Sequence, residues 1–207
     1  MIDRFLNSRW FKPLVFVLAL LPFAGIVIDA LTGGLAAEPI KDITHRTGDW
    51  GLRLLLLTLA ITPLRRLTGW GKLLRVRRML GLYTFFYIGL HFTTWLVLDH
   101  LFAWDEIVKD IVKRPYITVG FTGFLLLIPL AVTSTDAMIR RLGGRWRQLH
   151  RAVYAIAVLG VLHFLWSVKA DWREPLLYGA VLAVLLVARL PVVATRLDGL
   201  RKHIRAN

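Results

Sequence analysis

The chain has 207 residues, of which 57% are hydrophobic and 19% are charged, and its mean hydropathy is +0.59. A soluble domain usually holds about 45–50% apolar and about 25% charged residues, so this composition argues against a soluble fold. The formal net charge of +14 would favour nucleic-acid binding in a soluble protein, but the basic residues here lie in alternate loops between apolar runs, which argues against it. The chain contains no cysteine, which excludes disulfides, thiolate-held iron–sulfur clusters and covalently attached c-type haem.

Six apolar runs of about 17–23 residues are each long enough to cross about 30 Å of hydrocarbon as a helix. Only helices satisfy every backbone polar group within such a run, because a barrel would need shorter, alternating segments. The runs therefore predict an all-α membrane protein, a single domain over residues 1–207 built as a six-helix transmembrane bundle. The predicted spans are 13–31, 48–64, 79–101, 117–134, 149–168 and 176–197.

The distribution of basic residues predicts how the bundle is oriented. Most of the 27 Lys and Arg residues lie in the N-terminal arm, in the loops before the third and fifth spans, and in the C-terminal tail. Cytoplasmic loops hold such an excess, so we expect both termini in the cytoplasm. An alternative for the first span is a cleaved signal peptide with Leu35-Ala36-Ala37 as its cleavage site; the other five spans would keep their orientation.

Two histidines lie deep inside different predicted spans. His91 stands 12 residues after Met79, about 18 Å along the third span from the cytoplasm, at 1.5 Å per residue. His163 stands 14 residues after Leu149, about 21 Å along the fifth span. Ionisable side chains inside a span are costly and are functional candidates by default. Two imidazoles at matching depth can fill both axial positions of one haem iron, which favours electron transfer over ligand chemistry.

A third histidine, His150, lies at the cytoplasmic mouth of the fifth span, about 20 Å along the axis from His163, and marks a second cofactor position. The alternatives for all three histidines are hydrogen bonds between helices and a proton relay. A relay commonly recruits carboxylates, and the nearest acidic residues (Asp29, Asp49 and Asp99) fall at span ends, which favours haem.

Five further residues are expected at or near the membrane surfaces. His45 is predicted in a loop, His203 in the C-terminal tail, and His100 at the outer interface of the third span. Arg53 and Arg189 lie in or near spans, where each either extends to the interface or pairs with a haem propionate.

Three stretches, in order along the chain, resemble a known family. They are TGDW at 47–50 leading to ITPLRR at 61–66, RRMLGLY at 77–83 leading to LHF at 90–92, and RWRQLHR at 145–151 leading to LHF at 162–164. Together they resemble the MsrQ family, the haem-binding membrane subunits of bacterial protein-methionine-sulfoxide reductase systems, over essentially the whole chain. The resemblance implies a ferric-reductase-like transmembrane domain, in which two histidines on each of two helices commonly hold two stacked haems.

The resemblance implies ligands for two cofactor sites. His91 and His163 match the ligands of an outer b-type haem, and His150 matches a ligand at an inner position. The histidine expected opposite His150 is missing, and Arg77 and Arg78 stand about four helical turns before His91. The inner site is therefore expected to hold either a second haem with one other ligand or FMN, whose phosphate the two arginines would bind.

The resemblance also implies partners in the bacterial inner membrane and periplasm. Electrons would arrive from the quinone pool or a cytoplasmic flavin reductase. They would leave to MsrP, a periplasmic molybdenum enzyme that reduces methionine sulfoxide in envelope proteins. The chain itself would be an electron-transfer subunit without catalytic residues. Two alternatives stay open: a histidine-based proton-coupled transporter, and a stand-alone ferric or cupric reductase acting at an outer haem.

Overall fold

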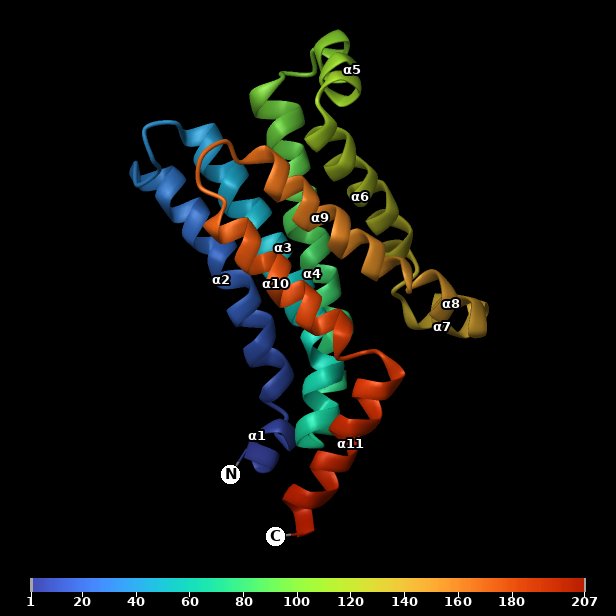
Figure 1. The fold of residues 1–207 in the computed structure, drawn as a ribbon. Helices are drawn as coiled ribbons and strands as arrows, with labels where there is room; N and C mark the ends of the chain where they lie inside the picture. Colours follow the sequence, from blue (N-terminus) through green and yellow to red (C-terminus); the bar gives the residue numbers. More distant parts are fainter. Residues whose placement is uncertain (1, 207) are drawn as a thin grey trace.

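The computed structural model describes residues 2–206, with side chains described for residues 5–199, and this part of the chain is helical without strands. The predicted all-α fold is confirmed. Figure 1 shows elongated helices packed side by side, with α1 and α11 toward one end of the molecule and α5 at the other. The elements are α1 (Ile2–Asn7), α2 (Phe11–Thr32), α3 (Pro39–Thr68), η1 (Gly71–Leu73), α4 (Leu74–Thr93), the π-helical η2 (Thr94–Asp99), α5 (Trp104–Lys113), α6 (Pro115–Val132), α7 (Asp136–Leu142), α8 (Gly144–Leu149), α9 (Ala152–Ser167), α10 (Arg173–Val187) and α11 (Pro191–Ala206).

Four helical segments of the described chain are long and apolar enough to cross a membrane. They coincide with the predicted first, third, fourth and fifth spans, and many of their apolar side chains, such as Leu18 and Leu21 on α2, are exposed. An apolar side chain that faces outward from a helix is compatible with lipid contact. The segments are Phe11–Thr32, Gly71–Asp99, Pro115–Val132 and Gly144–Ser167.

The predicted second span, 48–64, lies within α3, which is not one of these four segments. Asp49 and Arg53 make the outer half of this run more polar than a lipid-facing helix. α3 packs along α4 (Figure 1), and leucines such as Leu54, Leu55 and Leu59 are buried against neighbouring helices. A helix surrounded by protein needs fewer apolar residues, because other side chains can pair its polar groups.

The predicted sixth span, 176–197, is interrupted. α10 ends at Val187, α11 begins at Pro191, and the two helices are bent by 78°. Proline has no N–H to donate and disfavours the helical conformation of the residue before it, so the helix breaks at this point. The uninterrupted helix that we expected is corrected to a broken pair. Counted as one crossing, that pair brings the candidate spans to five.

The core consists of two apolar clusters, one joining α3 to α6, α9 and α10 and the other joining α2 to α3 and α4. The fully buried Tyr87 of α4 ties the second cluster together. Its hydroxyl donates to the Ala19 carbonyl at 2.8 Å and accepts from the Phe23 N–H at 3.0 Å. These are an i and i+4 pair of α2, so Tyr87 inserts into the hydrogen-bond ladder of that helix and fixes α2 against α4.

Several predicted loops contain helical structure. The outer loop after the third span holds the amphipathic α5, and the loop after the fourth span holds α7 and α8. The segment before the second span is also helical, because α3 begins at Pro39, a residue favoured at the first helical position. His45, predicted in a loop, therefore lies on α3, where it is exposed. His203 lies in α11, outside the residues whose side chains are described.

Candidate functional site

The structure brings His91 and His163 together near the outer ends of α4 and α9. Their rings face each other with 5.9 Å between centroids and cross at 82°. Each ring is fixed by a helix other than its own: Nδ1 of His91 donates to the Thr44 carbonyl of α3 at 2.8 Å. Nδ1 of His163 donates to the Tyr116 carbonyl of α6 at 2.7 Å. Because a carbonyl only accepts, both imidazoles carry their proton on Nδ1, which leaves Nε2 as the metal-binding nitrogen.

This arrangement fits a haem iron between the two rings. An imidazole nitrogen binds a metal at about 2 Å, so two rings on opposite sides of one iron have centroids roughly 6 Å apart. The observed separation of 5.9 Å agrees with that spacing. A metal-bound histidine also usually donates its other ring N–H to a carbonyl or carboxylate, as Nδ1 does here. Within the described residues no group of three or more His, Cys, Asp or Glu side chains gathers in a way that could hold a metal ion.

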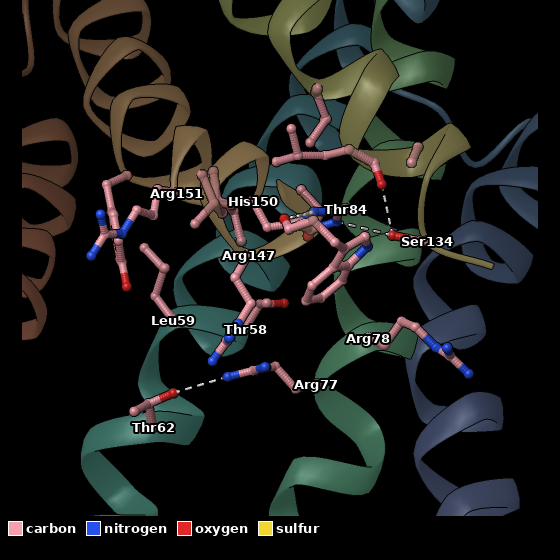
Figure 2. Close-up of a pocket in the computed structure, with 18 of the residues that line it drawn as sticks. Thr58, Leu59, Thr62, Arg77, Arg78, Thr84, Ser134, Arg147, His150 and Arg151 are labelled. Atoms are coloured by element: carbon pink, nitrogen blue, oxygen red, sulfur yellow. Dashed lines mark hydrogen bonds between the residues drawn. The ribbon is translucent and has the colours of Figure 1, made fainter. Parts of the chain in front are cut away.

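The predicted inner residues line one cavity of about 300 Å³, shown in Figure 2. His150 stacks on Trp146 with ring centroids 3.8 Å apart, and its Nδ1 donates to the Trp146 carbonyl at 3.1 Å. Its Nε2 lies 3.5 Å from the Ser134 hydroxyl. The imidazole therefore presents Nε2 toward the cavity side that carries Ser134.

Five arginines contribute to the wall of this cavity. Two of them, Arg77 and Arg78, are neighbours on α4 but make different contacts. Arg77 reaches toward α3, where it donates to the Thr62 hydroxyl at 3.4 Å. Arg78 forms an ion pair with Asp136 at the start of α7, and its guanidinium holds the pKa of that exposed carboxyl below the ordinary value. The five arginines are Arg77, Arg78, Arg147, Arg151 and Arg189.

The contacts of the two arginine candidates, Arg53 and Arg189, are with residues outside the two histidine sites, with one exception. Arg53 donates to the Tyr178 hydroxyl at 2.7 Å and lies 3.5 Å from Glu174, so it joins α3 to α10. Arg189 is the exception, because it lines the inner cavity and donates to the carbonyl of Leu59.

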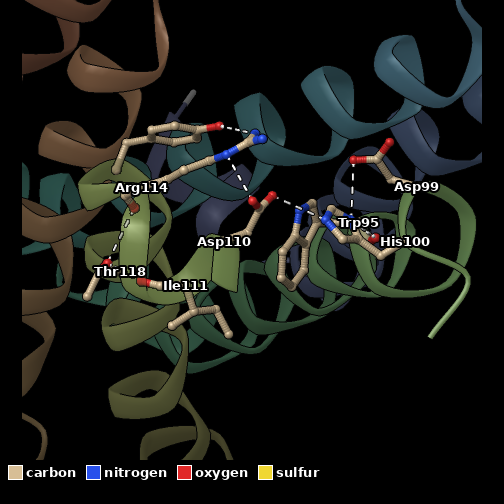
Figure 3. A network of polar contacts seen from close by, with 8 residues as sticks. Trp95, Asp99, His100, Asp110, Ile111, Arg114 and Thr118 are labelled. Atoms are coloured by element: carbon tan, nitrogen blue, oxygen red, sulfur yellow. Dashed lines mark hydrogen bonds and ion pairs between the residues drawn. The ribbon is translucent and has the colours of Figure 1, made fainter. Parts of the chain in front are cut away.

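His100 belongs to a polar network at the outer end, shown in Figure 3. Its Nε2 lies 3.2 Å from the Asp110 carboxylate, which also receives a bond from Arg114 at 3.0 Å. The His100 ring lies against Trp95, with ring centroids 4.5 Å apart and the ring planes tilted by 49°. The network links the end of the third predicted span to α5.

Sequence reasoning missed two groups of residues at these sites. The first comprises the Thr44 and Tyr116 carbonyls, which no side-chain pattern reveals. The second comprises wall residues of the inner cavity, of which Arg147 and Arg151 were visible as helical neighbours of His150, three and one residues away. In the sequence, both arginines belong to the stretch RWRQLHR and to the basic loop that indicates orientation, and neither is among the predicted site residues.

Residues 47–161 match the family described as ferric reductase like transmembrane component. A protein of Herminiimonas arsenicoxydans is 56% identical over 182 residues, covering 86% of this chain and 84% of its own length. A protein of Xanthomonas campestris pv. campestris strain B100 is 60% identical over 152 residues, covering 73% and 70%. Both are named protein-methionine-sulfoxide reductase heme-binding subunit MsrQ. The chain belongs to the MsrQ family. A further MsrQ relative, from Ralstonia nicotianae, is 55% identical over 85% of this chain. No solved structure matches the chain.

The matched segment includes most of the residues that form the two sites. It begins at Thr47 on α3, contains His91 and His150, and ends two residues before His163. Membership of this family, together with the apolar helices, makes the chain a multi-pass membrane protein.

Proposed function

We propose that this chain is the membrane subunit that carries electrons in a protein-methionine-sulfoxide reductase system, with a b-type haem held between His91 and His163. The observation that carries the proposal is the facing pair of imidazoles, each held by a carbonyl of another helix with Nε2 free for iron. Haem bound there would supply a one-electron carrier. Two protein ligands leave no open coordination position, which suits electron transfer. The name of the relatives, heme-binding subunit, supports the same cofactor class.

We place six crossings in the bacterial inner membrane, with both termini in the cytoplasm. α3 would be the second crossing, and the broken pair of α10 and α11 would be the sixth. The basic residues support this arrangement, since arginines concentrate in α7 and α8, in the last turn of α3 and in the first turns of α4, while the first turn of α5 holds Asp105 and Glu106. Figure 1 places α5 at the opposite end of the bundle from α1 and α11.

The inner cavity is proposed as a second cofactor position, for a haem or for FMN. His150 supplies one imidazole nitrogen, and the arginine-lined wall supplies guanidinium donors that suit propionate or phosphate oxygens. A volume of about 300 Å³ lies at the lower end of the usual range for ligand pockets. The cofactor would receive electrons from quinol or from a cytoplasmic flavin reductase.

The proposed acceptor is a periplasmic molybdenum-dependent catalytic subunit, MsrP. Reducing a sulfoxide takes two electrons and two protons and releases water, and we assign that chemistry to the partner. The role of this chain is to hold the carriers at fixed positions across the bilayer.

The first test is the reduced-minus-oxidised absorption spectrum of the full chain, purified in detergent after expression with adequate haem supply. We expect the bands of a low-spin b-type haem. A protein without those bands would contradict the proposal. The second test mixes the reduced protein with purified MsrP and a methionine-sulfoxide substrate, and we expect rapid reoxidation that requires both. Reoxidation by a ferric chelate but not by MsrP would favour the stand-alone ferric reductase instead.

A further inference from the structure

The two outer histidines are held by the same three-part unit, which occurs twice in the chain. On α3, the Thr44 carbonyl that accepts from His91 stands one helical turn before Gly48. The carbonyl and the histidine are 47 residues apart in sequence. Each unit therefore consists of a carbonyl, a glycine four residues later, and a histidine on the partner helix.

The second unit lies on α6 and α9 with the same spacing. The Tyr116 carbonyl accepts from His163, Gly120 follows four residues later, and the separation of carbonyl and histidine is again 47 residues. α3 packs most extensively on α4, and α6 on α9, so each unit belongs to one closely packed helix pair. The haem site is thus formed where two equivalent helix pairs each present one imidazole.

The glycine in each unit lies against the imidazole, so that a side chain at its position would come too close to the ring. A Cβ at Gly120 would stand 2.5 Å from Nδ1 and 2.9 Å from Cε1 of His163. A Cβ at Gly48 would stand 3.0 Å from Nδ1 and 3.2 Å from Cε1 of His91. Comfortable contacts between such atoms are about 3.5–4.0 Å, so any side chain at either position would push the ring away from its carbonyl.

We infer that Gly48 and Gly120 are positioning residues for the haem ligands. Each leaves room for one imidazole to lie flat against the neighbouring helix, so that the carbonyl one turn earlier fixes Nδ1 and directs Nε2 at the iron. This inference rests on the proposed haem between the two histidines. Glycine weakens a helix interior relative to alanine, so its presence at both equivalent positions agrees with a steric requirement.

Two other glycines on the same helices provide matched controls. Gly89 lies on α4 two residues before His91, and a Cβ there would meet nothing within 4 Å. Gly123 lies on α6 one turn after Gly120, and a Cβ there would make an ordinary contact of 3.5 Å with Leu159. Alanine at these two positions adds the same atom without approaching an imidazole.

The experiment compares Gly48→Ala and Gly120→Ala with Gly89→Ala and Gly123→Ala in the full chain. Loss of the group that accepts the other ring N–H of a metal-bound histidine typically lowers metal affinity by about 10- to 100-fold. We expect Gly120→Ala to lose haem to this extent, Gly48→Ala to lose less, and both to shift the low-spin electron paramagnetic resonance signal and the midpoint potential of the haem that remains. Both control variants should keep wild-type signals and potential. Wild-type signals in all four variants would overturn the inference.

A double-mutant cycle tests the steric argument without using bound haem as the readout. Alanine at position 120 should lower the unfolding temperature when His163 is present, and should not lower it in a His163→Ala background, where the ring is gone. An equal loss in both backgrounds would overturn the inference, because the clash would then lie elsewhere. If Gly120→Ala alone fails to accumulate as folded protein, recovery of folded protein in the double variant is the expected result, and continued failure contradicts the inference.

These outcomes separate the inference from the proposed function. A wild-type protein without low-spin haem contradicts the proposed function itself. A wild-type protein with low-spin haem that is indifferent to alanine at both positions contradicts only the positioning role.

Discussion

The outer and inner histidine sites are built at opposite ends of the same helices but hold their imidazoles differently. At the outer end, His91 and His163 face each other, and each Nδ1 is bound by a carbonyl of a neighbouring helix. At the inner end, His150 is bound by Trp146, one turn earlier in the same part of the chain, and stacks on that indole. A bond to another helix fixes a ring relative to the bundle, whereas the Trp146 bond fixes His150 relative to its own turn. The contact of His150 with another segment is the longer one, 3.5 Å between Nε2 and the Ser134 hydroxyl. The outer site is therefore a preorganised pair, and the inner site has one imidazole beside several arginines.

The spacing of the chain shows where the two helix pairs diverge. His150 stands 13 residues before His163, and Arg78 stands 13 residues before His91. The two helix pairs therefore share a histidine at the outer position, His91 in one and His163 in the other. At the inner position one pair has His150 and the other has Arg78. An inner cofactor would then be held by one imidazole nitrogen and by charge, which suits an anionic group.

The largest effect is expected when either histidine of the outer pair is replaced. His91→Ala or His163→Ala removes one of two axial ligands, and each variant should lose the low-spin signal of the outer haem. Haem content and the reduced-minus-oxidised spectrum measure this. His100→Ala is the control and should keep the outer haem spectrum, because His100 belongs to the separate network with Asp110. If both ligand variants kept a complete low-spin spectrum, the pairing would be wrong.

A smaller effect is expected at the inner site and should leave the outer site intact. His150→Ala and Arg77→Ala remove the imidazole and one guanidinium from the inner cavity, so bound haem or flavin there should fall while the outer spectrum persists. Quantifying haem and flavin per chain measures this. Arg75→Ala is a control on the same helix, because Arg75 is not among the residues that line the cavity. Loss of the outer haem in Arg77→Ala would show that the two sites are not independent.

The outer site combines residues that the sequence could predict with residues that it could not. The matching depths of His91 and His163 along their spans were predicted from the helical rise of about 1.5 Å per residue. The structure brings the two rings together, with 5.9 Å between centroids. The Thr44 and Tyr116 carbonyls could not be predicted, because any residue type offers a carbonyl and the partners are 47 residues apart. Backbone groups become visible only once helix packing is known.

Helix boundaries show the same limit at the level of the fold. Apolar runs located four spans, but α3 is helical well before position 48, because its first turns are stabilised by Pro39 and not by apolarity. Hydropathy also predicted one continuous span across the break before Pro191. The proline itself indicates the break, because it has no N–H to donate within a helix. Arg53 was treated as a candidate propionate partner, but its contacts with Tyr178 and Glu174 depend on α10 packing against α3.

The smallest expected effect concerns the ion pair between Arg78 and Asp136. Because the guanidinium lowers the pKa of the Asp136 carboxyl from its ordinary value of 3.8, the pair contributes to stability above that pH and the contribution is lost as pH falls through the lowered pKa. The two side chains are 40% and 68% exposed, so water screens the pair, and Asp136→Asn should leave the outer haem unchanged and alter inner cofactor content only slightly at neutral pH. Cofactor content of this variant, measured at low and high salt, checks it. A change as large as that in His150→Ala would show that Arg78 acts at the cofactor through this pair.

The central claim is that one haem is ligated by both His91 and His163. The most direct measurement is the low-temperature electron paramagnetic resonance spectrum of oxidised His150→Ala protein, in which the inner imidazole is absent, compared with the same protein carrying His163→Ala as well. We predict a low-spin ferric signal with two imidazole ligands in the single variant and its loss in the double variant. A single variant without that signal, or a double variant that retains it, would contradict the account.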